Sequence, residues 1–128
     1  MGVSYEKVHS FTDPRGLVVE LLAAEDFASQ RNAHVVVSSA EVVRGNHYHE
    51  QGRETITIIG PALVRFRENE KIEEVMVPDK EAWRFVFPSG VSHAIKNLSA
   101  EPNVLVAFNT VEHDPLNPDT YPDTLIEP

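Results

Sequence analysis

The fold is decided by two stretches of sequence, RGNHYHEQGRE at residues 44–54 and PSGVSHAIKN at residues 88–97. Together they supply three histidines and one glutamate, namely His47, His49, Glu54 and His93. Residues i and i+2 of a strand lie on one face about 6.5–7 Å apart, so the rings of His47 and His49 can reach one ion. A short turn and a new antiparallel strand would bring the carboxylate of Glu54 beside them. Three imidazoles and one carboxylate suit a divalent transition metal with open coordination positions.

Length and composition limit the kind of protein this can be. A chain of 128 residues has the size of one domain, and its 41% hydrophobic and 24% charged residues are typical of a globular protein. Its formal charge of -9 would repel nucleic acid and anionic membranes. It has no cysteine, which excludes disulfides and thiolate metal sites. Because it also lacks a long apolar run and a signal-like start, we expect a cytoplasmic protein that binds neither nucleic acid nor membranes.

Short apolar and β-branched segments, separated by Gly, Pro, Asn and Asp, predict an all-β protein. The expected strands are Leu17–Leu22, His34–Ser38, Glu41–Arg44, His47–His49, Glu54–Ile59, Ala62–Arg67, Ile72–Val77, Ala82–Phe87, His93–Lys96 and Val104–Phe108. The segment Ala24–Ala28 can form a short helix. Alternation places Trp83, Phe85 and Phe87 on one face of their strand, and we predict that this aromatic face belongs to the core.

The last quarter of the chain bears on assembly. The segment Val104–Phe108 is apolar on both faces, which suits a strand buried on two sides in a sandwich or at a subunit interface. We therefore expect a homodimer. The tail 112–128 holds four of the nine prolines, so we expect an extended arm that adds no strand and can reach a neighbouring subunit. With no internal repeat or linker, residues 1–128 form one domain with its core motifs in 44–109.

The two motifs resemble those of the cupin superfamily. They read Gly45-x-His47-x-His49-x4-Glu54-x5-Gly60 and Pro88-x-Gly90-x2-His93-x3-Asn97, although the family's first glycine usually lies further upstream. The resemblance implies a small double-stranded β-helix, or jelly-roll barrel, with His47, His49, Glu54 and His93 as metal ligands at its mouth. Zinc is the favoured metal, with iron, manganese and nickel as alternatives. The opposing interpretation is a core of hydrogen-bonded histidines without a metal.

A narrower resemblance suggests an activity. The segments Phe11–Leu21, Arg44–His49 and Asp114–Tyr121 are similar to the C-terminal cupin domain of bacterial capsular-polysaccharide enzymes that make UDP-deoxy-aminosugars. This implies a metal-dependent epimerase or isomerase acting beside the keto group of a 4-keto-6-deoxy sugar nucleotide, in polysaccharide precursor synthesis. The substrate would be a UDP-sugar or a dTDP-sugar. The opening Asp13-x-Arg15-Gly16 also resembles dTDP-4-keto-6-deoxyhexose epimerases and isomerases, which usually lack the metal motif.

The sequence departs from the capsular-enzyme pattern in two respects. It contains no Gly-rich dinucleotide fingerprint, so we expect another protein to perform any reduction. It also lacks the Lys-aromatic pair that often follows the glutamate, since Thr55-Ile56 stands there. The identity of the substrate therefore stays open.

Other site residues are nominated by their chemistry. A base and an acid must move the proton, and the candidates are His113, Tyr48, Tyr121 and His34. Arg15 and Arg44 are candidates for a diphosphate because they lie in the motif-bearing segments, and Asn97 is assigned to substrate binding. Three further arginines alternate with apolar residues and are expected on solvated strand faces, namely Arg65, Arg67 and Arg84.

Two other functions remain open. The same four ligands could serve a small metal cupin of different activity, such as a dioxygenase or a polyketide cyclase. The domain could also be a non-catalytic cupin that binds a metal or a ligand. Proton exchange with solvent would favour the epimerase, oxygen consumption the dioxygenase, and binding without turnover the non-catalytic cupin.

Overall fold

The computed structural model describes residues 2–128, which form twelve strands and one short 3-10 helix. Their bounds are β1 (Ser4–Val8), β2 (Ser10–Asp13), β3 (Gly16–Val19), η1 (Ala24–Ser29), β4 (Asn32–Ser38), β5 (Val43–Tyr48), β6 (Glu54–Ile59), β7 (Ala62–Glu68), β8 (Lys71–Val77), β9 (Ala82–Phe87), β10 (Ser92–Asn97), β11 (Asn103–Asn109) and β12 (Tyr121–Pro122). Among the described residues, no helix is long and apolar enough to cross a membrane.

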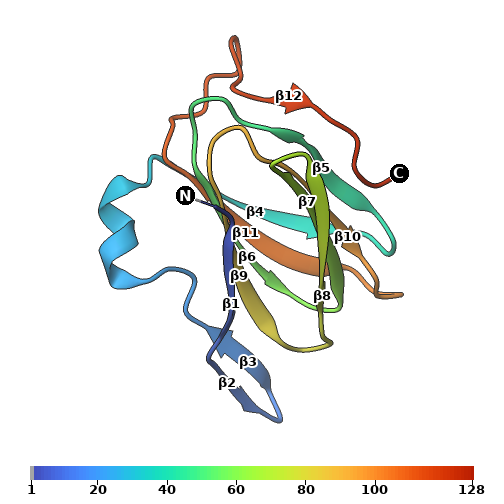
Figure 1. The fold of residues 1–128 in the computed structure, drawn as a ribbon. Coiled ribbons are helices and arrows are strands. Elements are labelled where there is room, and N and C mark those ends of the chain that lie inside the picture. The colour runs from blue at the N-terminus through green and yellow to red at the C-terminus, as the bar shows by residue number, and fades with distance from the viewer. Residues whose placement is uncertain (1) are drawn as a thin grey trace.

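Ten of the strands form two five-stranded sheets, in the orders β1-β9-β6-β11-β4 and β12-β5-β10-β7-β8. All neighbouring strands are antiparallel. The sheets face each other across the body of the molecule, and the small β2–β3 hairpin projects from it (Figure 1). The predicted all-β jelly-roll barrel is confirmed.

The core lies between the two sheets. Its largest fully buried apolar side chains are Phe66 from one sheet and Phe85 and Phe87 from the other. The predicted aromatic face of β9 is therefore in the core, and Trp83 packs against it while remaining partly buried. Removing apolar surface of this kind from water is the main stabilising contribution to a small domain.

The first two strands, β1 and β2, were not expected from the sequence, whereas β3 overlaps the expected strand Leu17–Leu22 but ends at Val19. The strand β1, Ser4–Val8, is polar and largely exposed, and it exists because it pairs with β9 along its whole length. The strands expected at 41–44 and 47–49 are one continuous strand, β5. Gly45 and Asn46 have positive φ within it. Because Gly and Asn are also common turn residues, the sequence here resembles a turn.

The C-terminal arm corrects a second expectation. Tyr121 and Pro122 form the short strand β12, which pairs with Tyr48 and His47 of β5 (Figure 1). The arm thus adds a strand to its own sheet. Further along, the side chains of Leu125 and Ile126 are buried and pack with Ala94, which fastens the arm to the barrel.

Candidate metal centre

The four predicted ligands meet at one end of the barrel. His47 on β5, His49 just after it and His93 on β10 come from one sheet, and Glu54 begins β6 of the other. Antiparallel pairing places His93 opposite His47. One donor atom from each of the four residues lies within 4.8 Å of the other three. Ligands of one ion at bonds of about 2.1 Å lie within about 4.2 Å of each other, so small side-chain rotations would close this cluster on a cation.

Gly45 allows the histidine strands to approach. A Cβ atom at this position would lie 2.7 Å from the carbonyl oxygen of His93, and the φ of Gly45 is +87°. The register of β5 and β10 shifts between His93 and Ala94, beside this contact. Only glycine combines this conformation with the close approach. The motif glycine thus has a packing role next to the site.

His93 is held from three sides. Its Nε2 lies 2.7 Å from Oε1 of Glu54, and its Nδ1 lies 3.1 Å from the carbonyl oxygen of Val91. The ring of Phe87 stacks on the imidazole with centroids 4.3 Å apart and planes 8° apart. The side chain is almost fully buried, at 1% exposure. Donation from Nδ1 to Val91 leaves Nε2 available toward the centre of the cluster.

His49 provides an observation that fits a metal. Its Nδ1 donates to the carbonyl oxygen of Asp119 at 2.6 Å, because that oxygen can only accept. In the neutral ring Nε2 carries a lone pair, and this atom is buried without a hydrogen-bond partner at 3.3 Å from Oε2 of Glu54. A lone pair and a carboxylate this close, removed from water, are stabilised by a positive charge between them, either a proton on Nε2 or a metal ion. The donor set therefore fits a divalent metal.

The protonation of the cluster is strongly perturbed. Burial lowers the pKa of His47 to about 4, assisted by repulsion from His93. Burial also disfavours a charge on His49, but Glu54 and Asp119 outweigh it and raise the pKa of that ring. Burial acts to raise the pKa of Glu54, yet its contacts with His49 and His93 hold it far below the usual range. At neutral pH the site thus offers a carboxylate and a neutral His47, the forms that bind metal.

These shifts predict different titrations for neighbouring rings. In the metal-free protein, His47 should titrate near pH 4, whereas His49 should titrate above the ordinary 6.5. Between pH 6.5 and 4, His47 is protonated in the unfolded chain but stays neutral in the folded protein. Lowering the pH through this range therefore favours the unfolded chain, and the contribution of His47 to the free energy of unfolding falls. Histidine 1H–15N NMR across a pH series measures each midpoint. Equal midpoints for the two rings would contradict this electrostatic description.

Two cavities meet at the cluster and share His34, His47 and Glu54. The outer cavity, of about 200 Å³, is lined by Asn32, His34, His47, His49, Glu54, Asn109, Val111, Glu112, His113, Asp114, Asp119 and Thr120. The inner cavity, of about 80 Å³, is lined by His34, Val36, Arg44, Gly45, His47, Glu54, Ile56, His93, Ile95, Leu105 and Ala107. The outer lining carries carboxylates and no Lys or Arg, whereas the inner lining includes a guanidinium.

The other nominated residues divide between positions at the site and positions away from it. His113 lines the outer cavity, Arg44 the inner one, and His34 both. The rings of Tyr48 and Tyr121 stack on each other, with centroids 5.4 Å apart, and line neither cavity. The catalytic role assigned to these tyrosines stays a prediction.

Asn97 and Arg15 also lie outside the two cavities. The buried amide of Asn97 donates to the carbonyl oxygens of Ser38, Ser39 and Glu101, which ties strand ends together. Arg15 sits on the exposed β2–β3 hairpin and pairs with Asp13. The substrate-binding roles assigned to both residues stay predictions.

Sequence reasoning missed Asp119 and Asn109. Asp119 accepts hydrogen bonds from the backbone of Glu50, Gln51 and Gly52, in the loop between two of the predicted ligands. Asn109 ends β11 opposite Glu54 and lines the outer cavity. An Asp after a proline reads as an ordinary turn residue, and nothing local indicates a partner some seventy positions away.

Known proteins resemble this chain over nearly its whole length. The UDP-2-acetamido-2,6-beta-L-arabino-hexul-4-ose reductase of Pseudomonas aeruginosa is 32% identical over 123 residues, which are 92% of this chain and 32% of that enzyme. CapF, a capsular polysaccharide assembling protein from Staphylococcus aureus, is 26% identical with a TM-score of 0.68, over 92% of this chain and 34% of CapF. The chain therefore spans about a third of the length of these two relatives.

A third likeness concerns the fold alone. ChmJ, a 3′-monoepimerase from Streptomyces bikiniensis, is 18% identical with a TM-score of 0.73, over 94% of this chain and 68% of ChmJ. The family model for the polysaccharide biosynthesis C-terminal domain matches residues 11–121. The expected resemblance to capsular-polysaccharide enzymes and the cupin jelly roll are thereby confirmed, and the chain belongs to the polysaccharide biosynthesis C-terminal domain family.

Proposed function

We propose that this domain is a metal-dependent epimerase or isomerase that acts on the carbon beside the keto group of a 4-keto-6-deoxy sugar nucleotide. The observation that carries the proposal is the cluster of His47, His49, Glu54 and His93 at the junction of two cavities. Membership of a polysaccharide-synthesis family and the names of the reductase and CapF support a sugar-nucleotide substrate.

The metal is proposed to be zinc, because a set of imidazoles with one carboxylate and no thiolate suits it. A divalent cation in this position supplies positive charge to the keto oxygen, which makes the neighbouring C–H more acidic. Glu54 and the three rings would hold it, with Phe87 and Val91 fixing the orientation of His93.

The chain's own residues must move the proton. His34 lies on β4 and lines both cavities, and His113 lines the outer cavity. A neutral imidazole can accept a proton from carbon, and a protonated imidazole can donate one. Two imidazoles on opposite faces of the carbon could therefore act as base and acid. Removal on one face and return on the opposite face inverts the centre. We propose that His34 and His113 share this work.

The charges around the cavities suggest how a diphosphate would lie. Glu112, Asp114 and Asp119 make the outer cavity unfavourable for phosphate oxygens. Arg44 lines the inner cavity and is held by the carbonyl oxygen of Val37 and the hydroxyl of Ser38, which use two of its five N–H groups. The remaining groups can bind a phosphate. We propose that the diphosphate approaches along Arg44.

Solvent exchange tests this activity. With a UDP-4-keto-6-deoxy-hexosamine in heavy water, the zinc-loaded protein should place deuterium on the carbon beside the keto group, as read by NMR and mass spectrometry. His34→Asn should slow exchange by about 10²–10⁴-fold, the usual contribution of a positioned acid or base. The matched change His9→Asn, away from both cavities, should leave it unchanged. Absence of exchange with every 4-keto sugar nucleotide tried would reject the epimerase, and oxygen consumption would favour a dioxygenase.

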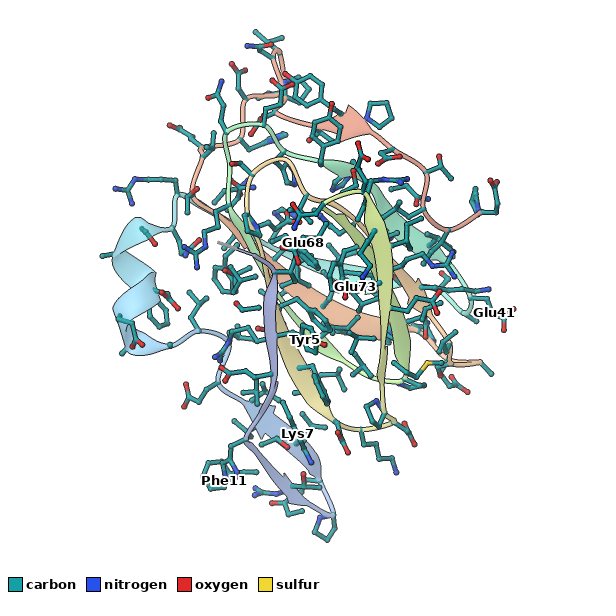
Figure 2. All side chains as sticks on the ribbon, in the orientation of Figure 1. Tyr5, Lys7, Phe11, Glu41, Glu68 and Glu73 are labelled. Atoms are coloured by element: carbon teal, nitrogen blue, oxygen red, sulfur yellow. The ribbon has the colours of Figure 1, made fainter. Side chains whose placement is uncertain are left out.

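The surface suggests a homodimer. Val104 is 39% exposed on the outer face of β11, so the expected burial of that strand on both sides is incomplete within one chain. Val35 and Val37, its neighbours on β4, are 64% and 56% exposed. The exposed side chains of Val35, Val37 and Val104 form one apolar surface, while Phe11 is exposed separately on the projecting hairpin (Figure 2). Because a two-fold contact pairs a patch with its own copy, we propose that a second copy covers the apolar surface of β4 and β11.

The dimer has its own test. Val35→Glu introduces a charge into the apolar surface of β4 and β11 and should yield monomers in sedimentation velocity, because an unpaired buried charge is costly. Met76→Glu makes the same kind of change on β8 of the other sheet and should leave the dimer intact. A wild-type protein that sediments as a monomer would refute the proposal.

A further inference from the structure

The C-terminal arm reaches the loop that joins two of the proposed ligands. This loop, residues 50–52, follows His49 and precedes Glu54. Oδ1 of Asp119 accepts from the backbone N–H of Glu50 at 2.9 Å, and Oδ2 accepts from Gln51 at 3.0 Å and Gly52 at 2.9 Å. Three successive N–H groups around one carboxylate form an anion-binding nest. The arm therefore fixes the shape of the loop through one side chain.

Asp119 contacts the site a second time through its backbone. Its carbonyl oxygen accepts from Nδ1 of His49 at 2.6 Å. A proton held on Nδ1 leaves the lone pair on Nε2, the atom that faces Glu54. One residue of the arm thus binds the loop with its carboxylate and selects the tautomer of a ligand with its carbonyl group.

The arm is anchored beyond Asp119, which makes it a rigid support. The side-chain oxygen of Asn46 accepts from the backbone N–H of Leu125 at 2.8 Å and of Ile126 at 3.0 Å, and its amide donates to the carbonyl oxygen of Ile126 at 2.9 Å. Asn46 lies next to His47 on β5. Both ends of the segment 119–126 are therefore attached beside ligands.

We propose that Asp119 is a positioning residue, whose carboxylate docks the C-terminal arm so that its carbonyl group holds the His49 ring with Nε2 directed at the metal. The inference rests on the proposed metal site and extends it to a segment outside the ligand motifs. Without the carboxylate the arm and the loop lose their shared contact, and the His49 ring becomes free to rotate or to change tautomer.

The test compares two acidic residues that line the same cavity. Asp119→Ala removes the nest contact, whereas Asp114→Ala removes an equal charge from the outer cavity and touches only the neighbouring Leu116 N–H. Zinc affinity by competition with a chromogenic chelator should fall about 10–100-fold in Asp119→Ala, the usual loss when a ligand's hydrogen-bond partner is disturbed. Affinity in Asp114→Ala should match the wild type. Asp119→Asn, which keeps one acceptor oxygen, should lie between them and serves if Asp119→Ala folds poorly.

A second measurement separates positioning from charge. Histidine 15N NMR of the metal-free protein at alkaline pH should find His49 with its proton on Nδ1 in the wild type and a mixture of tautomers in Asp119→Ala. An unchanged tautomer would overturn the inference, even if affinity fell, because the loss would then reflect charge alone. If the wild type bound no divalent metal, the proposed function would fail, and the tautomer would still decide whether Asp119 positions the ring.

Discussion

Glu54→Gln is expected to lose zinc binding by more than about 100-fold, beyond the range seen when only a partner of a ligand is changed. The substitution keeps the size of the side chain but removes its negative charge, and it replaces one of the two carboxylate oxygens facing His49 and His93 with an NH2 group that cannot bind a metal. It acts at a residue that is 6% exposed, where water cannot replace the lost carboxylate. Isothermal titration calorimetry and metal analysis of the purified variant measure the loss.

Glu73→Gln on β8 provides the matched control for Glu54→Gln. It removes the same charge from an exposed strand outside the two cavities and should bind zinc as the wild type does. Equal zinc affinity for the two variants would show that the cluster does not hold the metal. Substoichiometric zinc with full occupancy by iron in the wild type would revise the choice of metal and leave the four ligands in place.

Phe87→Ala is expected to destabilise the metal-free protein by about 3–5 kcal/mol, the usual cost of deleting a buried aromatic ring. Phe87 is 1% exposed and stacks on Phe85 with planes 7° apart as well as on His93. Removing it leaves a cavity directly behind the His93 ring, so zinc affinity should fall together with stability. Urea unfolding gives the free energy, and chelator competition gives the affinity.

Two further variants separate packing from the metal site. Phe87→Leu restores part of the volume and should recover part of the stability. Ile72→Ala deletes apolar surface from a residue that is already 51% exposed and should cost little. If Phe87→Ala unfolded at the same urea concentration as Ile72→Ala, the aromatic face of β9 would not be the core that its burial indicates.

Strands that obey a simple pattern were predictable from sequence to the residue. Both β6, Glu54–Ile59, and β9, Ala82–Phe87, have the expected bounds, since each is a short apolar run ended by Gly or Pro. The strand β1 has no such pattern, because its pairing with β9 leaves most of its side chains in water. The strands β2 and β12 also depend on context rather than composition, whereas β3 overlaps the expected strand Leu17–Leu22. The hydrophobic pattern of a strand reflects the burial of its side chains, so a strand that buries few side chains cannot be recognised by this pattern.

The candidate site also contains residues that the sequence predicts and residues that it does not. The spacing of His47 and His49 follows from strand geometry, and His93 came from the second motif. The expected route for Glu54 was wrong: β6 does not pair with β5 but with β9 and β11, so Glu54 meets the histidines from the opposite sheet. The contribution of Asp119 was not predictable, because its contacts are made to backbone groups of a distant loop. Tyr48 and Tyr121 were nominated by chemistry, yet neighbouring strands stack them on each other. The sequence shows which side chains could take part in proton transfer or metal binding, but the fold determines which of them face the same cavity.

The anchored arm has a consequence for how far the domain can be shortened. All strands through β11 end at residue 109, yet the acceptor for Nδ1 of His49 and the carboxylate that binds the loop after it both belong to residue 119. A truncation just after β11 would therefore keep the strands of the barrel and remove the support of one proposed metal ligand.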